Sequence, residues 1–116
     1  MSELSNVITR IRAFRHARDW MQFHNPKNLA CSIAIEAGEL LEHFQWKTEK
    51  ESAQHAKKRK SELAAEIADI AIYLLELTDN LGIDLVDAIE KKLQNNERRY
   101  PIEKSKNKAL KYTELK

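Results

Sequence analysis

The chain has few of the residues that make turns and cross-links: two glycines, two prolines and one cysteine among 116 residues. Sheet-rich folds need many turns, so this shortage favours long helices with few connections. A single cysteine excludes an internal disulfide and a cysteine-based zinc site. No stretch approaches the ~18 uncharged apolar residues of a membrane span, and we expect no signal peptide. The composition therefore predicts one all-α, cytoplasmic domain without a membrane partner.

Charge of neither sign dominates the chain. It has 20 basic and 18 acidic residues, a formal net charge of +2. This balance gives no case for a general polyanion binder, so we expect no nucleic-acid partner. The basic residues gather at positions 57–60 and after Lys104, where the apolar pattern ends. We expect a folded domain at residues 1–103 and a loosely attached, Lys-rich tail at residues 104–116.

Apolar periodicity predicts four helices, typical of a bundle-like domain. The expected ranges are about 5–22, 28–46, 61–81 and 85–100. The segment 47–60 has no apolar stripe and fits either a solvated connection or a short exposed helix. Gly82 is placed to stop the third helix, and Asp84 is placed to cap the fourth.

The second predicted helix is apolar around nearly its whole circumference. This pattern is typical of a central, buried helix. Asn25 is a suitable N-cap for it, and Pro26 suits its first turn. Cys31 lies in this stretch, and we expect it to be a small buried core residue.

Carboxylates interrupt the two most apolar helices. Glu36 and Glu39 lie three residues apart on one helix, and Glu66 and Asp69 have the same spacing on another. Residues three apart share a helix face, so each pair of like charges repels. An unpaired buried carboxylate costs several kcal/mol. The side chains could face solvent, could pair with buried basic residues, or could hold a divalent metal ion; the spacing alone leaves these open.

The ligand type narrows the choice of metal. Carboxylates without imidazole or thiolate suit hard cations, Mg²⁺ or Mn²⁺. A di-iron bundle would need two Glu-x-x-His pairs on neighbouring helices, and the third predicted helix has no histidine. Because Mg²⁺ usually serves the phosphate groups of a substrate, a magnesium site indicates nucleotide chemistry.

These residues also carry a family resemblance. Glu36-Ala37-Gly38-Glu39, followed by Glu66-Ile67-Ala68-Asp69, resembles the ExxE…ExxD signature of the MazG-like all-α nucleoside triphosphate pyrophosphohydrolases. Further segments are similar to the dCTP pyrophosphatase branch: Arg18-Asp19-Trp20, Phe23-His24, Phe44-Gln45-Trp46 and Arg99-Tyr100-Pro101. The resemblance covers about residues 11–101. It implies a four-helix bundle-like domain that assembles as a homodimer or as a dimer of dimers, a homotetramer.

The resemblance also implies roles for particular residues. The metal ligands would be Glu36, Glu39, Glu66 and Asp69, with Glu36 or Glu39 accepting a proton from the attacking water. The base and sugar pocket would be formed by Trp20, Phe23, His24, Trp46 and Tyr73. The phosphates would lie near Lys92, Asn96 and Arg99. The implied reaction is Mg²⁺-dependent hydrolysis of a nucleoside triphosphate to the monophosphate and pyrophosphate. One departure concerns base preference, since some relatives have a nucleotide-contacting histidine where this chain has Ile11.

Other interpretations remain beside this one. The aromatic residues at helix ends could be plain hydrophobic anchors, and Lys92 and Arg99 could be solvated charges. The runner-up function is a non-catalytic nucleotide-binding helical module. A purely structural bundle with buried ion pairs is a third possibility. Within the enzyme class, dUTPase or phosphoribosyl-ATP pyrophosphohydrolase chemistry is compatible with the same fold.

Overall fold

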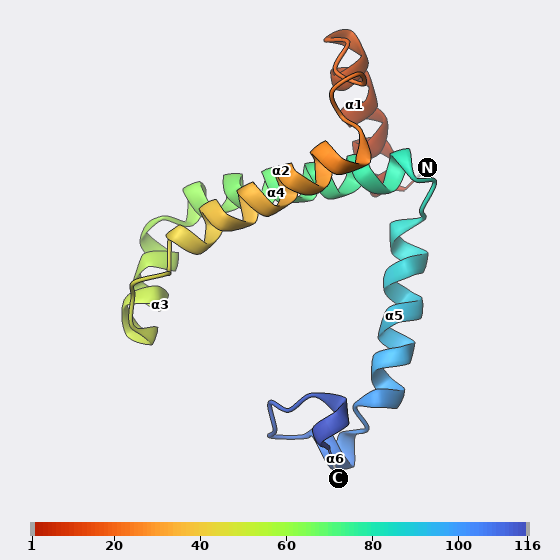
Figure 1. Cartoon of the computed structure of the whole chain (residues 1–116). Helices are drawn as coiled ribbons and strands as arrows, with labels where there is room; N and C mark the ends of the chain where they lie inside the picture. Colours follow the sequence, from red (N-terminus) through yellow and green to blue (C-terminus); the bar gives the residue numbers. More distant parts are fainter. Residues whose placement is uncertain (1, 116) are drawn as a thin grey trace. The chain divides into compact units, whose positions relative to one another are not determined.

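The computed structural model describes residues 2–115, and within them it contains helices and no strand. The elements are α1 (Glu3–Ala17), α2 (Pro26–Glu42), α3 (Glu49–Lys58), α4 (Lys60–Asn80), α5 (Leu85–Arg99), α6 (Ile102–Ser105) and a 3₁₀ turn, η1 (Tyr112–Glu114) (Figure 1). The all-α prediction is confirmed. In this part of the chain, no helix has both the length and the apolar composition that a membrane crossing requires. The chain divides into two compact units, Met1–Gly82 and Ile83–Lys116.

The first unit is built around α2 and α4. These helices run antiparallel and pack along each other (Figure 1), and α1 and α3 also contact α4. Leu29 of α2 is almost fully buried, and the other buried apolar residues among positions 2–115 are Leu63 and Leu75 of α4. The core is therefore a thin seam between two helices, and that seam also carries the acidic residues.

Local capping explains where the helices begin. The Asn25 side chain accepts a hydrogen bond from the backbone N–H of Asn28 at 2.9 Å, and Pro26 occupies the first turn of α2 as predicted. Thr48 and Glu51 form a reciprocal capping box at the start of α3. The segment 47–60 is thus a short exposed helix, the second of the two predicted alternatives.

The first helix is shorter than predicted. It ends at Ala17 instead of about residue 22, and Asp19 follows with a backbone φ of +53°. A non-glycine residue in this left-handed conformation breaks the helical path. Trp20 consequently lies in a turn, where its backbone carbonyl accepts hydrogen bonds from the N–H groups of Phe23 and His24. At the other end of the unit, Gly82 adopts a φ of +66° beyond α4, as expected for a helix stop.

The prediction of a fully buried second helix is wrong for the chain by itself. The side of α2 that faces away from α4 is exposed, and Ile35 and Leu41 are 62% and 58% accessible. Cys31 is also exposed, which corrects the prediction that it is a core residue. The reason is the number of neighbours: an all-round apolar helix needs partners on every side, and within its unit α2 packs mainly on α4.

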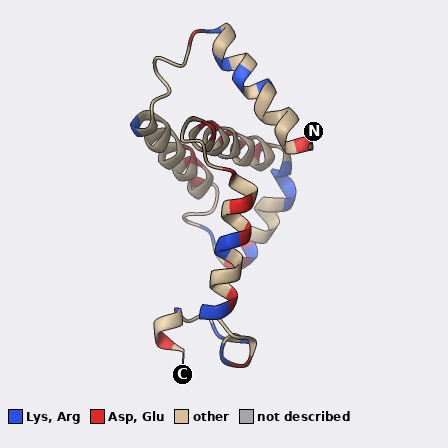
Figure 2. Cartoon of the chain, turned by 90° about the vertical axis from the view of Figure 1, so that its right-hand side faces the viewer, with Lys and Arg blue, Asp and Glu red and all other residues tan. Residues whose placement is uncertain are grey.

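The second unit begins with α5. The Asp84 side chain accepts a hydrogen bond from the N–H of Asp87 at 3.1 Å, which confirms the predicted cap. Acidic and basic residues follow one another along this helix (Figure 2), and Lys91 pairs with Asp87 at 2.8 Å. After α6, Tyr112 lies beneath the Arg99 guanidinium, 4.5 Å from its carbon to the ring centre. The predicted division between residues 103 and 104 stays a prediction.

Candidate metal centre and adjoining cavity

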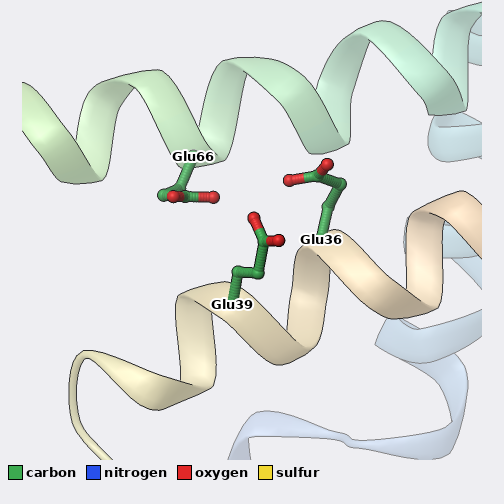
Figure 3. Close-up of side chains that lie close together, drawn as sticks. All are labelled: Glu36, Glu39 and Glu66. Carbon is green, nitrogen blue, oxygen red and sulfur yellow. The ribbon is translucent and has the colours of Figure 1, made fainter.

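Three carboxylates meet in the seam between α2 and α4. Glu36 and Glu39 come from consecutive turns of α2 and Glu66 comes from α4, and all three point toward one another (Figure 3). Each offers one oxygen that lies within 4.8 Å of the others. The i, i+3 spacing on α2 and the antiparallel packing of α4 produce this arrangement. The structure therefore brings together three of the four predicted metal ligands, and their binding of a metal stays a prediction.

Asp69, the fourth predicted ligand, lies beside the cluster but is not one of the three residues whose oxygens lie within 4.8 Å of one another. It is one turn beyond Glu66 on α4, and its side chain lines the adjacent cavity. Repulsion from the Asp69 carboxylate nevertheless contributes to the raised pKa of both Glu36 and Glu66. Asp69 is therefore placed at the border between the carboxylates and the cavity.

Repulsion and burial set the electrostatics of the cluster. Burial is the largest cause of the raised pKa of Glu36, followed by hydrogen bonding to Glu39 and repulsion from it. Burial likewise leads the causes that raise the pKa of Glu66, and Glu39 again supplies the next contributions. Each shift means that negative charge is disfavoured here without compensation. A proton or a cation would relieve it.

The donor set fits a hard divalent cation. One oxygen of Glu36 and one of Glu66 are buried and have no hydrogen-bond partner in the described part of the chain. Among residues 2–115, no Lys, Arg or His side chain forms an ion pair with any of the three glutamates. Buried ion pairs thus do not explain the cluster. Full solvation does not explain it either, because Glu36 and Glu66 are partly buried. Oxygen-only ligands suit Mg²⁺, Mn²⁺ or Ca²⁺.

A cavity of about 420 Å³ adjoins the cluster on the Asp69 side. Aromatic rings follow one another along it: Phe14 and Trp20 have ring centres 5.6 Å apart, Trp20 and His24 5.8 Å, and His24 and Tyr73 6.4 Å. The complete lining is Val7, Arg10, Ile11, Phe14, Trp20, His24, Asp69, Ile72, Tyr73 and Glu76. A cavity of this size with aromatic walls and a few polar groups is typical of a small-molecule site.

Tyr73 lies where the cavity approaches the carboxylates. Burial raises the pKa of its hydroxyl, and the charges of Glu36, Glu76 and Asp69 raise it further. The hydroxyl therefore keeps its proton at neutral pH and remains available as a hydrogen-bond donor.

A second hollow lies on the other side of the cluster. It shares Glu39 and Glu66 with the cluster and is otherwise lined by Glu42, His43, Lys47 and His55. Nδ1 of His43 and Nε2 of His55 are 2.8 Å apart, so one ring nitrogen donates and the other accepts. Burial is the first cause that lowers the pKa of His55, and Lys47 is the next.

The structure brings together some of the predicted pocket residues and separates others. Trp20, His24 and Tyr73 line the cavity, and their role in a base and sugar pocket stays a prediction. Phe23 and Trp46 are 58% and 87% exposed and are not among the lining residues. The remaining predicted contacts belong to α5 in the second unit, and their roles stay predictions: Lys92, Asn96 and Arg99.

Sequence reasoning missed the polar residues at the end of α4. Glu76 is 3% exposed and lines the cavity. Asp79 pairs with Arg12 and Arg15, and Asn80 accepts a hydrogen bond from Arg15 at 3.0 Å. One signal was available, because Glu76 follows Tyr73 by three residues and so shares its helix face.

The class that the fold and the site define is a small all-helical domain with a carboxylate cluster between antiparallel helices, which could hold a cation, and an aromatic cavity beside it. The family model for the MazG-like family matches residues 31–115. The chain belongs to the MazG-like family, and the resemblance predicted from the ExxE…ExxD residues is confirmed.

Relatives of known identity support this assignment. The chain is 41% identical over 111 residues to dCTP pyrophosphatase 1 of Mus musculus, which covers 93% of this chain and 65% of that protein. The identity to dCTP pyrophosphatase 1 of Homo sapiens is 40% over the same length, with the same shares covered. The chain thus spans slightly less than two thirds of the length of these curated relatives.

A solved structure resembles the fold over nearly its whole length. A pyrophosphatase from Archaeoglobus fulgidus, of known crystal structure, superimposes with a TM-score of 0.84 and is 43% identical in sequence. The match covers 87% of this chain and 94% of the archaeal one. The predicted MazG-type helical architecture is therefore found in a protein of similar size.

Proposed function

We propose that the protein hydrolyses nucleoside triphosphates to the monophosphate and pyrophosphate in a metal-dependent reaction. The observation that carries this proposal is the group of three glutamate oxygens within 4.8 Å of one another, beside an aromatic cavity of about 420 Å³. The names of the relatives point the same way, since they are a pyrophosphatase and two dCTP pyrophosphatases. This chemistry would serve the control or cleaning of a cytoplasmic nucleotide pool.

The proposed cofactor is Mg²⁺, with Mn²⁺ as the substitute. Glu36, Glu39 and Glu66 would hold it, with Asp69 as a further ligand from the cavity side. When bound, the ion would offset the charge of the triphosphate and fix the orientation of its oxygens. The partner-free oxygens of Glu36 and Glu66 support this assignment, because they already lack other hydrogen bonds.

The protein's own residues would divide the remaining work. The ring of Trp20 offers a face on which a base could stack, and the hydroxyl of Tyr73 would donate a hydrogen bond to the sugar or the first phosphate. Glu39 is the most exposed glutamate of the cluster. We assign to it, with Glu36 as the alternative, the orientation of the attacking water and acceptance of its proton.

The substrate preference that we propose is for deoxynucleotides of the dCTP type. This rests on the names of the mouse and human relatives. Phe23 and Trp46 stay proposed contacts to the base, and both offer exposed aromatic surface. For the phosphates we propose the polar residues of α5: Lys92, Asn96 and Arg99.

We also propose that the chain assembles with copies of itself, as a dimer or a dimer of dimers. On α2, the exposed residues include Cys31, Ala34, Ile35, Gly38 and Leu41, which recur every three or four positions and so form one stripe. A matching stripe on α4 contains Ala64, Ile67, Ala68, Ala71 and Leu74. Such contiguous apolar faces are typical of an interface between subunits.

A nucleotide panel tests the proposed function. The protein is incubated with the deoxynucleoside and ribonucleoside triphosphates, with Mg²⁺ or with EDTA, and the monophosphate and diphosphate products are separated. We expect monophosphate and pyrophosphate with Mg²⁺ and no turnover in EDTA. If every nucleotide stays intact while some bind, the alternative of a non-catalytic nucleotide-binding module replaces this proposal.

A further inference from the structure

Glu76 is a buried carboxylate that the proposed hydrolysis does not use. It lies on α4, is 3% exposed, and still contributes to the wall of the large cavity. One of its oxygens, Oε2, lies 2.7 Å from Nδ1 of His24. Neither of these two atoms makes a hydrogen bond with any other described residue. A carboxylate held in this way, without a basic partner such as Arg or Lys, is costly to bury.

The cavity that Glu76 lines has both apolar and polar residues in its wall. Ile11, Phe14 and Ile72 are apolar, and the other polar side chains besides Glu76 are Arg10, His24, Asp69 and Tyr73. Because the apolar side chains cannot form hydrogen bonds, each polar group has a large influence on which ligand is accepted.

His24, which contacts Glu76, is fixed from its backbone. The side-chain amide of Asn80 donates a hydrogen bond to the carbonyl of His24 at 2.9 Å. Asn80 is held in turn by the buried guanidinium of Arg15 at 3.0 Å. The polar end of the cavity is thus anchored to α1 and α4, and a carboxylate in a fixed position can select a ligand by geometry.

We propose that Glu76 is a specificity-determining residue that accepts a hydrogen bond from the exocyclic amino group of the nucleobase. This inference rests on the proposed function and names the base chemistry of the same site. An ionised carboxylate has only acceptors. Cytosine and adenine present an amino donor, whereas uracil and thymine present a carbonyl oxygen at the corresponding position. The carboxylate therefore favours amino-bearing bases and repels the keto bases.

The first test compares dCTP with dUTP, whose bases have the same size and differ at position 4, amino against keto, and at N3, an acceptor in cytosine and an N–H donor in uracil. We expect kcat/KM of the unmodified protein to favour dCTP by about tenfold or more, the scale on which an unmatched buried polar group is penalised. In Glu76→Gln the amide can donate as well as accept, so this ratio should fall toward one. Glu62→Gln is the matched control, since Glu62 lies on the same helix with its side chain 55% exposed.

A second test needs no variant and covers the case in which Glu76→Gln does not fold. The substrate N4,N4-dimethyl-dCTP keeps the cytosine ring and has no amino donor. We expect the unmodified protein to discriminate against it as it does against dUTP. The added methyl groups also enlarge the base, so poor turnover of this substrate could come from steric exclusion. The base of dUTP is no larger than that of dCTP, and poor turnover of dUTP therefore cannot be explained by size. Equal kcat/KM for dCTP and dUTP overturns the inference, and so does a ratio unchanged in folded Glu76→Gln.

Binding measurements separate this inference from the proposed function. Calorimetry with Glu39→Gln, which is expected not to hydrolyse, measures the affinities of dCTP and dUTP in the presence of Mg²⁺. If dCTP binds tenfold more tightly than dUTP but the unmodified protein hydrolyses neither, the proposed enzymatic function is wrong and the role of Glu76 stands. If the unmodified protein hydrolyses both nucleotides with equal kcat/KM, the enzymatic function stands and the role of Glu76 is wrong.

Discussion

Glu39 differs from the other two glutamates of the cluster in its exposure and in its role. It raises the pKa of both Glu36 and Glu66, and it is the most exposed residue of the three. An acceptor of a water proton must be reachable by that water, which is why the chemistry is assigned to Glu39.

Replacing Glu39 with glutamine should therefore remove turnover and leave the fold intact. The amide keeps the size of the side chain, lowers the repulsion in the cluster and cannot accept the proton. We expect kcat to fall about 10²–10⁴-fold, the usual contribution of general acid–base catalysis. Circular dichroism checks the fold, and Glu62→Gln is the surface control. Full activity of a folded Glu39→Gln protein would exclude this role.

Asp79 allows a prediction of pH dependence. Hydrogen bonding from Arg12 is the largest cause that lowers the pKa of Asp79, and Arg15 adds to it. A carboxyl whose pKa is lower in the folded than in the unfolded protein stabilises the fold at pH values above its unfolded value, near 3.8. This stabilisation is lost as the pH falls from that value through the lowered native one.

Asp79→Asn should thus lower the free energy of unfolding by about 1–3 kcal/mol at pH 7, the scale for hydrogen bonds to charged groups. Near pH 3 the difference from the unmodified protein should become smaller. Urea unfolding at the two pH values measures it. Glu62→Gln, whose partner Arg59 is exposed, should change stability by less than about 1 kcal/mol. A difference that is equal at both pH values would contradict the assigned cause.

At the scale of helices, the α2–α4 pair is held together by a few leucines and pushed apart by the carboxylates of its seam. Glu36 and Glu66 have raised pKa values in the folded protein, so the folded state binds more protons than the unfolded one above the ordinary value of 4.5. The metal-free protein should consequently lose stability as the pH rises from 4.5 through the raised values.

A divalent ion should reverse this loss. Ligands that bind only the folded state raise its stability by mass action, by about 2.7 kcal/mol at a concentration one hundred times Kd. We expect Mg²⁺ or Mn²⁺ to raise the melting temperature of the unmodified protein at pH 7.

The matched variant for this experiment is Glu36→Gln. It should be more stable than the unmodified protein in EDTA and should respond less to Mg²⁺, because one repelling charge and one ligand are gone. Thermal unfolding with and without the ion measures both effects. An equal metal response in the two proteins would remove Glu36 from the ligand set.

The helices and their ends could be predicted from the sequence better than the tertiary contacts and the burial of their residues. The caps at Asn25 and Asp84, and the stop at Gly82, follow from local hydrogen bonding and backbone conformation, which single residues determine. The spacing of Glu36 and Glu39 also determined their common face. The end of α1 was not predictable in the same way, since it depends on Asp19 adopting a conformation that is rare outside glycine.

The contact of Glu76 with His24 could not be predicted without the tertiary structure. Periodicity places it on the face of Tyr73, but its proximity to His24 arises only when the turn after α1 packs against α4. The burial of Cys31 was likewise overestimated. An apolar pattern indicates that a helix face will be covered, but it does not indicate whether the same chain or another copy covers it.

For the whole molecule, the apolar stripes of α2 and α4 give a test of assembly. Leu41 is 58% exposed on its stripe, and a lysine there would place a charge in the proposed interface. We expect the unmodified protein to scatter light as a multiple of its 13.5 kDa chain at micromolar concentration, and Leu41→Lys to shift toward the single chain. Gln54→Lys, on the exposed part of α3, is the control. A monomeric unmodified protein would exclude self-assembly.

The antiparallel packing of α2 and α4 has a further consequence for how the protein folds. The two helices are separated by a connection, residues 43–59, that contains α3, so each contact between them joins residues that are distant along the chain. The entropy of closing this connection must be lost before the contacts between the helices form. The three glutamates therefore meet only when the helical hairpin has formed, and an ion in solution would find its complete set of ligands only in the packed pair of helices.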